Sequence, residues 1–218
     1  MGAIGETSAQ LAIRDPDTRL MLGVRDDEAG AFEQLVANYQ SRLVGVMHHL
    51  VGNAAEAEDL AQEVFLRVYR ARKKYRARCK FSTWLFTIAN NLALNVLRTR
   101  KRRPAVSLSL RDSGPLGARP AEQLVTAPSG SQPIRRMQRQ ELTTVIRDAL
   151  DKLNERQRLA VVLNKFEDMN YAEIAEVMGL TVKAVKSLLC RARMNLREAL
   201  KDYVFMDGQP IPEPPEGG

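Results

Sequence analysis

Apolar residues recur at three- and four-residue steps through much of the first hundred positions, a spacing typical of helices with one buried face. From residue 18 this spacing predicts successive helices, and Gly52-Asn53 separates the first two, with Asn53 placed to cap the second. The predicted inner faces consist of Phe32, Leu35, Val36, Tyr39, Leu43, Val46, Met47 and Leu50, then Ala57, Leu60, Ala61, Val64, Phe65 and Val68, then Trp84, Ile88, Leu92 and Val96. Because no alternating strand pattern interrupts them, residues 18–103 are expected to form an all-helical bundle.

Proline, glycine and serine replace the helical spacing after Pro104. Residues 104–136 have the composition of a linker, and they are too many for a loop inside one compact domain. Helical spacing resumes over residues 137–203, whereas residues 1–17 and 204–218 lack it and are expected to be disordered tails. The predicted fold class is therefore all-α, with two small helical domains joined by a flexible linker.

The second predicted domain has the spacing of a helix-turn-helix between Tyr171 and Leu200. A short helix ends at Gly179, which suits a tight turn, and Thr181 can cap a longer second helix. Capping boxes are expected at Asn154 with Gln157 and at Asn170 with Glu173. The inward face of the longer helix consists of Val182, Val185, Leu189, Ala192 and Leu196, and its outward face of Lys183, Ala184, Lys186, Ser187, Cys190, Arg191 and Met194. Such a helix can contact base edges and phosphates, so the motif favours DNA binding over an ordinary two-helix corner with a basic solvent face.

Composition limits the kinds of partner and the cellular compartment that the sequence favours. The 218-residue chain carries a formal net charge of +7 and a pI near 9.6, which favours a polyanionic partner. Cys79 and Cys190 form no C-x-x-C pair and the histidines are His48 and His49 alone, so neither a disulfide framework nor a metal site is predicted. No apolar stretch approaches the roughly 18 to 20 residues of a membrane span. We therefore expect a reduced, cytoplasmic protein without cofactor or membrane insertion.

The segment from Lys80 to Arg103 combines three kinds of chemistry that suit nucleic acid. Aromatic faces can stack on bases, amides can contact base edges, and clustered basic groups neutralise phosphates. The segment provides them in that order, as Phe81, Trp84 and Phe86, then Asn90 and Asn91, then Arg98, Arg100, Lys101, Arg102 and Arg103. Such a surface suits strands that are being opened. The plain alternative is an amphipathic core helix with a solvated basic end.

Both halves, in this order and spacing, resemble a bacterial RNA polymerase sigma factor of the extracytoplasmic-function type, in the sigma-70 family. DLAQEVFLRVYRA (Asp59 to Ala71) resembles the helix that docks on the clamp of the polymerase β′ subunit, and FSTWLFTIANNLALNVLRTRKRR resembles the promoter-melting segment. LNERQRLAVVLNKFEDMNYAEIAEVMGL and the helix after it resemble the domain that recognises the minus-thirty-five element. The resemblance implies a transcription initiation factor, not an enzyme, that binds core polymerase and recognises and melts the minus-ten element.

The resemblance assigns sigma region two to residues 18–103, region four to residues 137–203, and roles to single residues. The polymerase-binding residues are Asp59, Gln62 and Glu63. The minus-ten residues are Tyr75, Trp84, Asn91, Arg98, Arg100 and Lys101. The minus-thirty-five residues are Lys183, Lys186, Ser187, Cys190 and Arg191. The implied partners are promoter DNA and core RNA polymerase, through its β′ clamp helices and β flap, and the sequence leaves open whether an anti-sigma factor binds.

Three stretches depart from the family pattern. Arg76-Ala77-Arg78 replaces the Arg-Gly-Asp or Arg-Gly-Glu that is common there, which makes the expected base-capture loop more basic. Leu188 and Cys190 replace a common arginine and serine. The linker carries several arginines where the family is often acidic.

Two other classes of protein fit parts of the sequence. A free-standing helix-turn-helix transcriptional regulator with a ligand-sensing bundle would leave the basic aromatic segment unexplained. An enzyme is disfavoured because His48-His49 lies in an apolar helix without catalytic spacing around it. No Gly-x-x-x-x-Gly-Lys loop indicates a nucleotide-driven motor.

Overall fold

The computed structural model describes residues 13–102, 142 and 144–204, and every regular element among them is helical. The first half contains α2 (Pro16–Arg25), α3 (Ala31–Val51), α4 (Ala54–Ala71), the 3-10 helix η1 (Arg72–Lys74) and α5 (Phe81–Arg102). The second half contains α7 (Glu155–Lys165), α8 (Tyr171–Met178), α9 (Val182–Ala199) and α10 (Lys201–Val204), preceded by helical residues 144–151. The all-α prediction is confirmed, whereas the predicted linker lies outside the described residues.

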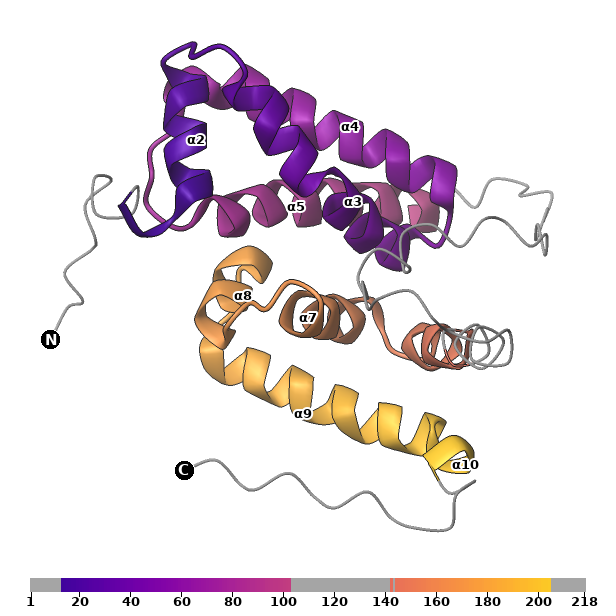
Figure 1. The fold of residues 1–218 in the computed structure, drawn as a ribbon. Coiled ribbons are helices and arrows are strands. Elements are labelled where there is room, and N and C mark those ends of the chain that lie inside the picture. Colours follow the sequence, from indigo (N-terminus) through magenta and orange to yellow (C-terminus); the bar gives the residue numbers. More distant parts are fainter. Residues whose placement is uncertain (1–12, 103–141, 143, 205–218) are drawn as a thin grey trace, which may run out of the picture.

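Helix α3 is the centre of the first half and packs against α4, α2 and α5 (Figure 1). The core that these helices enclose includes Leu35, Leu43, Met47, Val64, Val68, Phe81 and Phe86. Gly52 ends α3 in the left-handed conformation at φ +76°, and its N–H bonds the His48 carbonyl. The Asn53 side chain then accepts the Glu56 N–H at 2.9 Å, which confirms it as the cap of α4.

The N-terminus of α5 is capped by residues from a distant part of the chain. The Phe81 N–H donates to the Asp15 carboxylate at 3.0 Å and to the Thr18 hydroxyl at 3.1 Å. Thr18 is fully buried and itself donates to Asp15 at 2.6 Å. Helix α2 therefore begins at Pro16, inside residues 1–17, which were expected to be a disordered tail. The reason is that Asp15 and the start of α2 supply hydrogen-bond acceptors for the N-terminus of α5.

Replacing Asp15 with alanine should lower the free energy of unfolding by about 1 kcal/mol, because a helix end loses one of its acceptors. Urea denaturation followed by circular dichroism measures this loss. Asp26→Ala is the matched control, since the Asp26 carboxylate is 63% exposed and pairs with its neighbour Arg25, so this change should leave stability almost unaltered. Equal effects of the two substitutions would contradict the capping role.

The second half is a helix-turn-helix whose helices begin at the predicted caps. Asn154 and Asn170 both form capping boxes, with Gln157 and Glu173 respectively. Gly179 adopts φ +62° between α8 and α9, and the Thr181 hydroxyl accepts the Ala184 N–H at 3.2 Å. Buried Val185, Leu189 and Ala192 face inward along α9, as predicted.

The two halves pack against each other, which the sequence did not predict. Helix α5 lies along α8 and α3 lies along α7, while α9 lies on the side of the second half away from the first (Figure 1). Buried apolar residues of both halves form one continuous core. The described part of the chain is therefore a closed arrangement of two helical layers.

Candidate nucleic-acid interface

The outer face of α4 carries the predicted polymerase-binding residues. Asp59 and Gln62 are exposed, and Glu63 is half-buried in an ion pair with Arg67, with 2.8 Å between Oε1 and Nε. Leu60, Ala61 and Val64 fill the opposite, buried face. Leu66 is 49% exposed and Tyr69 is 43% exposed, so the outer face combines polar groups with uncovered apolar surface. That combination is typical of a protein-binding surface.

The loop between η1 and α5 holds Tyr75 and approaches Trp84 in α5. Tyr75 is buried, with 3% of its surface exposed, and its ring centroid lies 4.8 Å from that of the half-buried Trp84. Burial raises the pKa of Tyr75 to about 12. In this closed arrangement Tyr75 belongs to the core of the first half, and Trp84 is the more accessible of the two rings.

A shallow depression of about 490 Å³ lies beside these rings. Its walls consist of Ala71, Lys74, Tyr75, Arg76, Arg78, Cys79, Trp84 and Glu176. Basic side chains next to an aromatic ring suit a flipped base and its phosphates. Glu176 belongs to α8, so the second half contributes an acidic group to this basic surface.

The neighbouring amides of α5 have different surroundings. Asn91 is exposed and available to a ligand, whereas Asn90 is 5% exposed and its Nδ2 donates to the Val177 carbonyl at 3.2 Å. Sequence reasoning singled out Asn91 and missed the role of Asn90. The 3.6-residue period could have indicated it, because Asn90 lies four residues after Phe86 and three before Ala93, on the buried face that both occupy.

The basic end of α5 serves two roles. Arg98 is exposed and Lys101 lies in the last turn of the helix. Arg100 instead donates to the Val51 carbonyl at 3.1 Å and forms an ion pair with Glu56. Arg100 therefore holds the end of α3 and the start of α4, and its side chain is still 46% exposed.

The five residues of the recognition helix that were assigned to the minus-thirty-five element face solvent, whereas Ala184, also predicted to face outward, is half-buried. Lys183, Lys186, Ser187, Cys190 and Arg191 are exposed along α9. Val182 was predicted to face inward but is 41% exposed. The reason is its place as the first residue of α9, since side chains on a helix tilt toward its N-terminus and Val182 therefore extends past the packed turns.

Residues 13–102 and 144–204 give no support for a metal site or a membrane-spanning helix. No group of three or more His, Cys, Asp or Glu residues there is placed to hold a metal ion, and no helix there is long and apolar enough to cross a membrane. Burial lowers the pKa of His49 to about 4, with smaller contributions from His48, Arg147 and Arg158, so this histidine is neutral at physiological pH.

Comparison with known proteins gives the family. The chain matches the family description "Sigma-70 region 2" over residues 35–103 and "Sigma-70, region 4" over residues 143–196. It is 34% identical to the RNA polymerase sigma-H factor of Pseudomonas aeruginosa, over 86% of this chain and 95% of that protein. The chain belongs to the sigma-70 family. It is also 32% identical to the ECF RNA polymerase sigma factor SigW of Bacillus subtilis, over 82% of this chain and 94% of that protein, so this sigma factor is of the ECF type.

A solved structure supports the fold of this sigma factor. CnrH, described in complex with the cytosolic domain of CnrY, superposes with a TM-score of 0.62 at 25% identity and covers 86% of this chain and 99% of that one. Sigma factors are transcription initiation factors, so the prediction that this chain acts in initiation is confirmed at the level of the family. The two family matches cover most of α3 and α9 and all of α4, α5, α7 and α8, which include the elements that carry the surfaces described above.

Proposed function

We propose that this sigma factor binds core RNA polymerase through the outer face of α4 and directs promoter-specific initiation. In this proposal, α9 recognises the minus-thirty-five element, and α5 with the Tyr75–Lys80 loop recognises and melts the minus-ten element. The observation that carries the proposal is the agreement between exposure and assigned role on α9, where all five assigned residues are exposed on a capped helix.

Recognition by α9 follows from its position in the helix-turn-helix. The early exposed residues Lys183, Lys186 and Ser187 lie where a recognition helix contacts bases and phosphates in the major groove. Arg191, one turn further along, holds a phosphate and fixes the register of the helix on the duplex. Cys190 is exposed beside Arg191 and contributes a small side chain where a common family residue is serine.

Melting requires binding energy that exists only in the opened state. Unstacking and unpairing a base costs about a few kcal/mol. Stacking on Trp84, a hydrogen bond from Asn91 and phosphate contacts from Arg76 and Arg78 offset this cost without nucleotide hydrolysis. Tyr75 contacts the opened strand only once the loop moves away from the core, since its ring is buried in the closed arrangement.

Run-off transcription with purified core polymerase on a library of genomic fragments tests the proposed function. We expect start sites that depend on this chain and share two upstream motifs. A free-standing regulator would bind DNA without comigrating with core polymerase in size-exclusion chromatography, which is the result that would favour that alternative.

A protein partner is also proposed, because the related CnrH is described in complex with the cytosolic domain of CnrY.

Substitutions in α9 should separate affinity from specificity. Arg191→Ala should weaken promoter binding by the holoenzyme for all sequences and lower the salt dependence by about 0.9 in the log–log slope, the amount for one lost phosphate contact. Ser187→Ala should instead change the preferred base at one or two positions, at a cost of roughly 1 to 3 kcal/mol. Selection of bound sequences and salt titrations measure both effects.

Arg25→Ala is the charge-matched control for Arg191, because Arg25 lies in α2 and pairs with Asp26. It should leave both the slope and the preferred sequence unchanged. An unchanged upstream motif for Ser187→Ala would show that another residue contacts the bases.

A further inference from the structure

Helix α9 carries a row of basic side chains that no carboxylate neutralises within the described part of the chain. The helix contains a single acidic residue, Glu198. Its exposed basic residues are Lys183, Lys186, Arg191, Arg193 and Arg197. None of these five is in an ion pair with another described residue. Such a row attracts any anionic segment that can reach it.

The basic residues of α9 share their face with uncovered apolar surface. Lys183, Cys190 and Arg197 are seven residues apart, so they follow one another along one side of the helix. Met194, four residues after Cys190, lies on this side and is 65% exposed. Tyr203 of α10 is 55% exposed. Methionine and aromatic side chains are enriched in protein interfaces, so this face suits an acidic peptide that also has apolar residues.

The sequence after α10 has that composition. Residues 205–218 lie outside the described part of the chain, and they contain three carboxylates and no lysine, arginine or histidine. The carboxylates belong to Asp207, Glu213 and Glu216, and Ile211 lies between them. Four prolines surround Ile211 and Glu213. Because proline fixes φ near −65°, such a segment loses less conformational entropy when it docks than a chain without proline.

The segment is long enough to reach the basic residues. Helix α9 has 18 residues and is about 27 Å long. Helix α10 continues from its C-terminal end and finishes at Val204. Glu213 and Glu216 follow Val204 by nine and twelve residues, which span at most roughly 30 and 40 Å when extended. A segment that runs back along α9 can therefore place its carboxylates beside the basic residues from Arg197 to Lys183.

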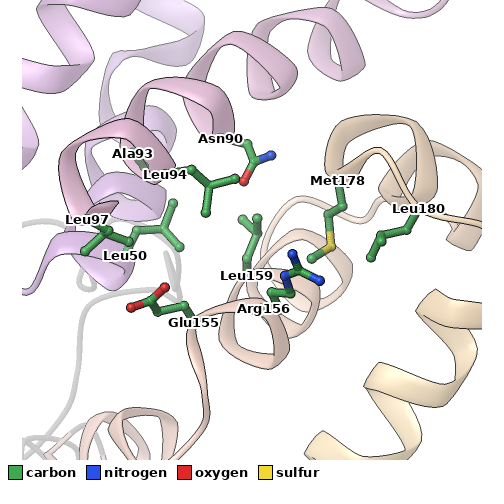
Figure 2. Close-up of a pocket in the computed structure, with 10 residues that line it drawn as sticks. All are labelled: Leu50, Asn90, Ala93, Leu94, Leu97, Glu155, Arg156, Leu159, Met178 and Leu180. Atoms are coloured by element: carbon green, nitrogen blue, oxygen red, sulfur yellow. The ribbon is translucent and has the colours of Figure 1, made fainter. Parts of the chain in front are cut away.

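The surface between the two halves leaves no room for this segment. Figure 2 shows Leu50, Leu94 and Leu97 of the first half facing Leu159 and Met178 of the second. The cavity between them has a volume of only about 40 Å³, which suits water molecules and not a peptide. Helix α9 lies on the side of the second half away from the first, and its basic face is open to solvent (Figure 1).

We propose that the acidic segment Asp207–Glu216 docks along the basic face of α9 and competes there with duplex DNA. This inference rests on the proposed role of α9 in promoter recognition. The carboxylates take the places of phosphates, and the covalent tether gives them an effective concentration of roughly millimolar, so pairs that are weak singly act together. Non-specific duplex, which is held through its phosphates, loses the competition more readily than a promoter that also gains base contacts.

Neutralising the segment in the full chain tests the competition. The variant carries Asp207→Asn, Glu213→Gln and Glu216→Gln, and the control removes the same charge from exposed carboxylates of the first half, through Asp26→Asn, Glu33→Gln and Glu58→Gln. The variant should bind a fluorescent duplex of mixed sequence roughly tenfold more tightly than the control at low salt. This difference should shrink as the salt concentration rises, because screening weakens the contact within the chain.

Cys190 reports on the contact in the absence of DNA, because its thiol is exposed on the proposed docking face. Iodoacetamide should alkylate Cys190 severalfold faster in the neutralised variant than in the control, since a docked segment covers the thiol and its carboxylates disfavour the thiolate. Mass spectrometry of the Cys190 peptide measures the rate. In the unaltered chain the rate should not change with protein concentration. A rate that falls with concentration would assign the face to a second copy and overturn the proposal.

Equal alkylation rates of Cys190 in the variant and the control would show that the segment does not dock on α9. Equal duplex affinities would show that it does not compete with DNA, and either result would overturn the proposal. A failure of the proposed function would look different. Ser187→Ala and Arg191→Ala would then leave promoter binding unchanged, while the alkylation of Cys190 would still report the docked segment.

Discussion

Replacing both Asp59 and Gln62 with lysine should abolish stable binding to core RNA polymerase, with a loss of affinity of roughly 100-fold or more. Both residues are exposed on the outer face of α4, and the buried face of this helix is filled by other residues, so the folded structure should not change. Glu63 is the less informative target, because its ion pair with Arg67 would be broken at the same time. Fluorescence anisotropy with labelled core polymerase measures the loss, and run-off transcription should fall with it.

Glu33→Lys serves as the control, since Glu33 is an exposed carboxylate on α3 outside the proposed docking face. It should bind core polymerase nearly as well as the unaltered chain. If the Asp59 and Gln62 variant binds within twofold of this control, core polymerase docks on another surface. An unchanged far-ultraviolet spectrum distinguishes lost docking from lost folding.

The helices and their ends could be predicted because the signals are local. A three- and four-residue apolar spacing identifies the buried face of a helix, and a capping residue satisfies N–H groups only two or three positions away. Asn53, Asn154, Asn170 and Thr181 all cap the helices that the sequence indicated. The exposed face of α9 follows largely from the same periodicity, although Val182 is more exposed and Ala184 less exposed than predicted.

Contacts between distant segments could not be predicted in this way. Periodicity shows that a face is buried but not which surface covers it, so the cap that Asp15 provides for Phe81 has no local signal. The ion pair between Arg42 and Glu167 joins residues 125 positions apart. Tyr75 lies in a segment that has the composition of a binding loop, and yet its ring packs in the core beside Trp84.

Asn91→Ala should slow promoter opening by roughly tenfold or more while sparing polymerase binding and the closed complex, since a lost hydrogen bond to a base is worth about 1 to 3 kcal/mol. The Asn91 side chain is exposed, so its contribution is expected only once a base has left the duplex. Permanganate reactivity of thymines near the start site measures opening. A template with a mismatched bubble removes the cost of unpairing and should rescue much of the defect.

Asn90→Ala is the matched comparison because the same amide is removed one residue away. Asn90 is buried against the Val177 carbonyl. Its loss should therefore loosen the packing of α5 against α8 in the free chain and raise the rate at which iodoacetamide alkylates Cys79. A premelted bubble should not alter that effect, because it arises before any DNA is bound. If Asn91→Ala instead lowers the melting temperature and depresses closed and open complexes equally, then Asn91 stabilises the fold and another side chain holds the flipped base.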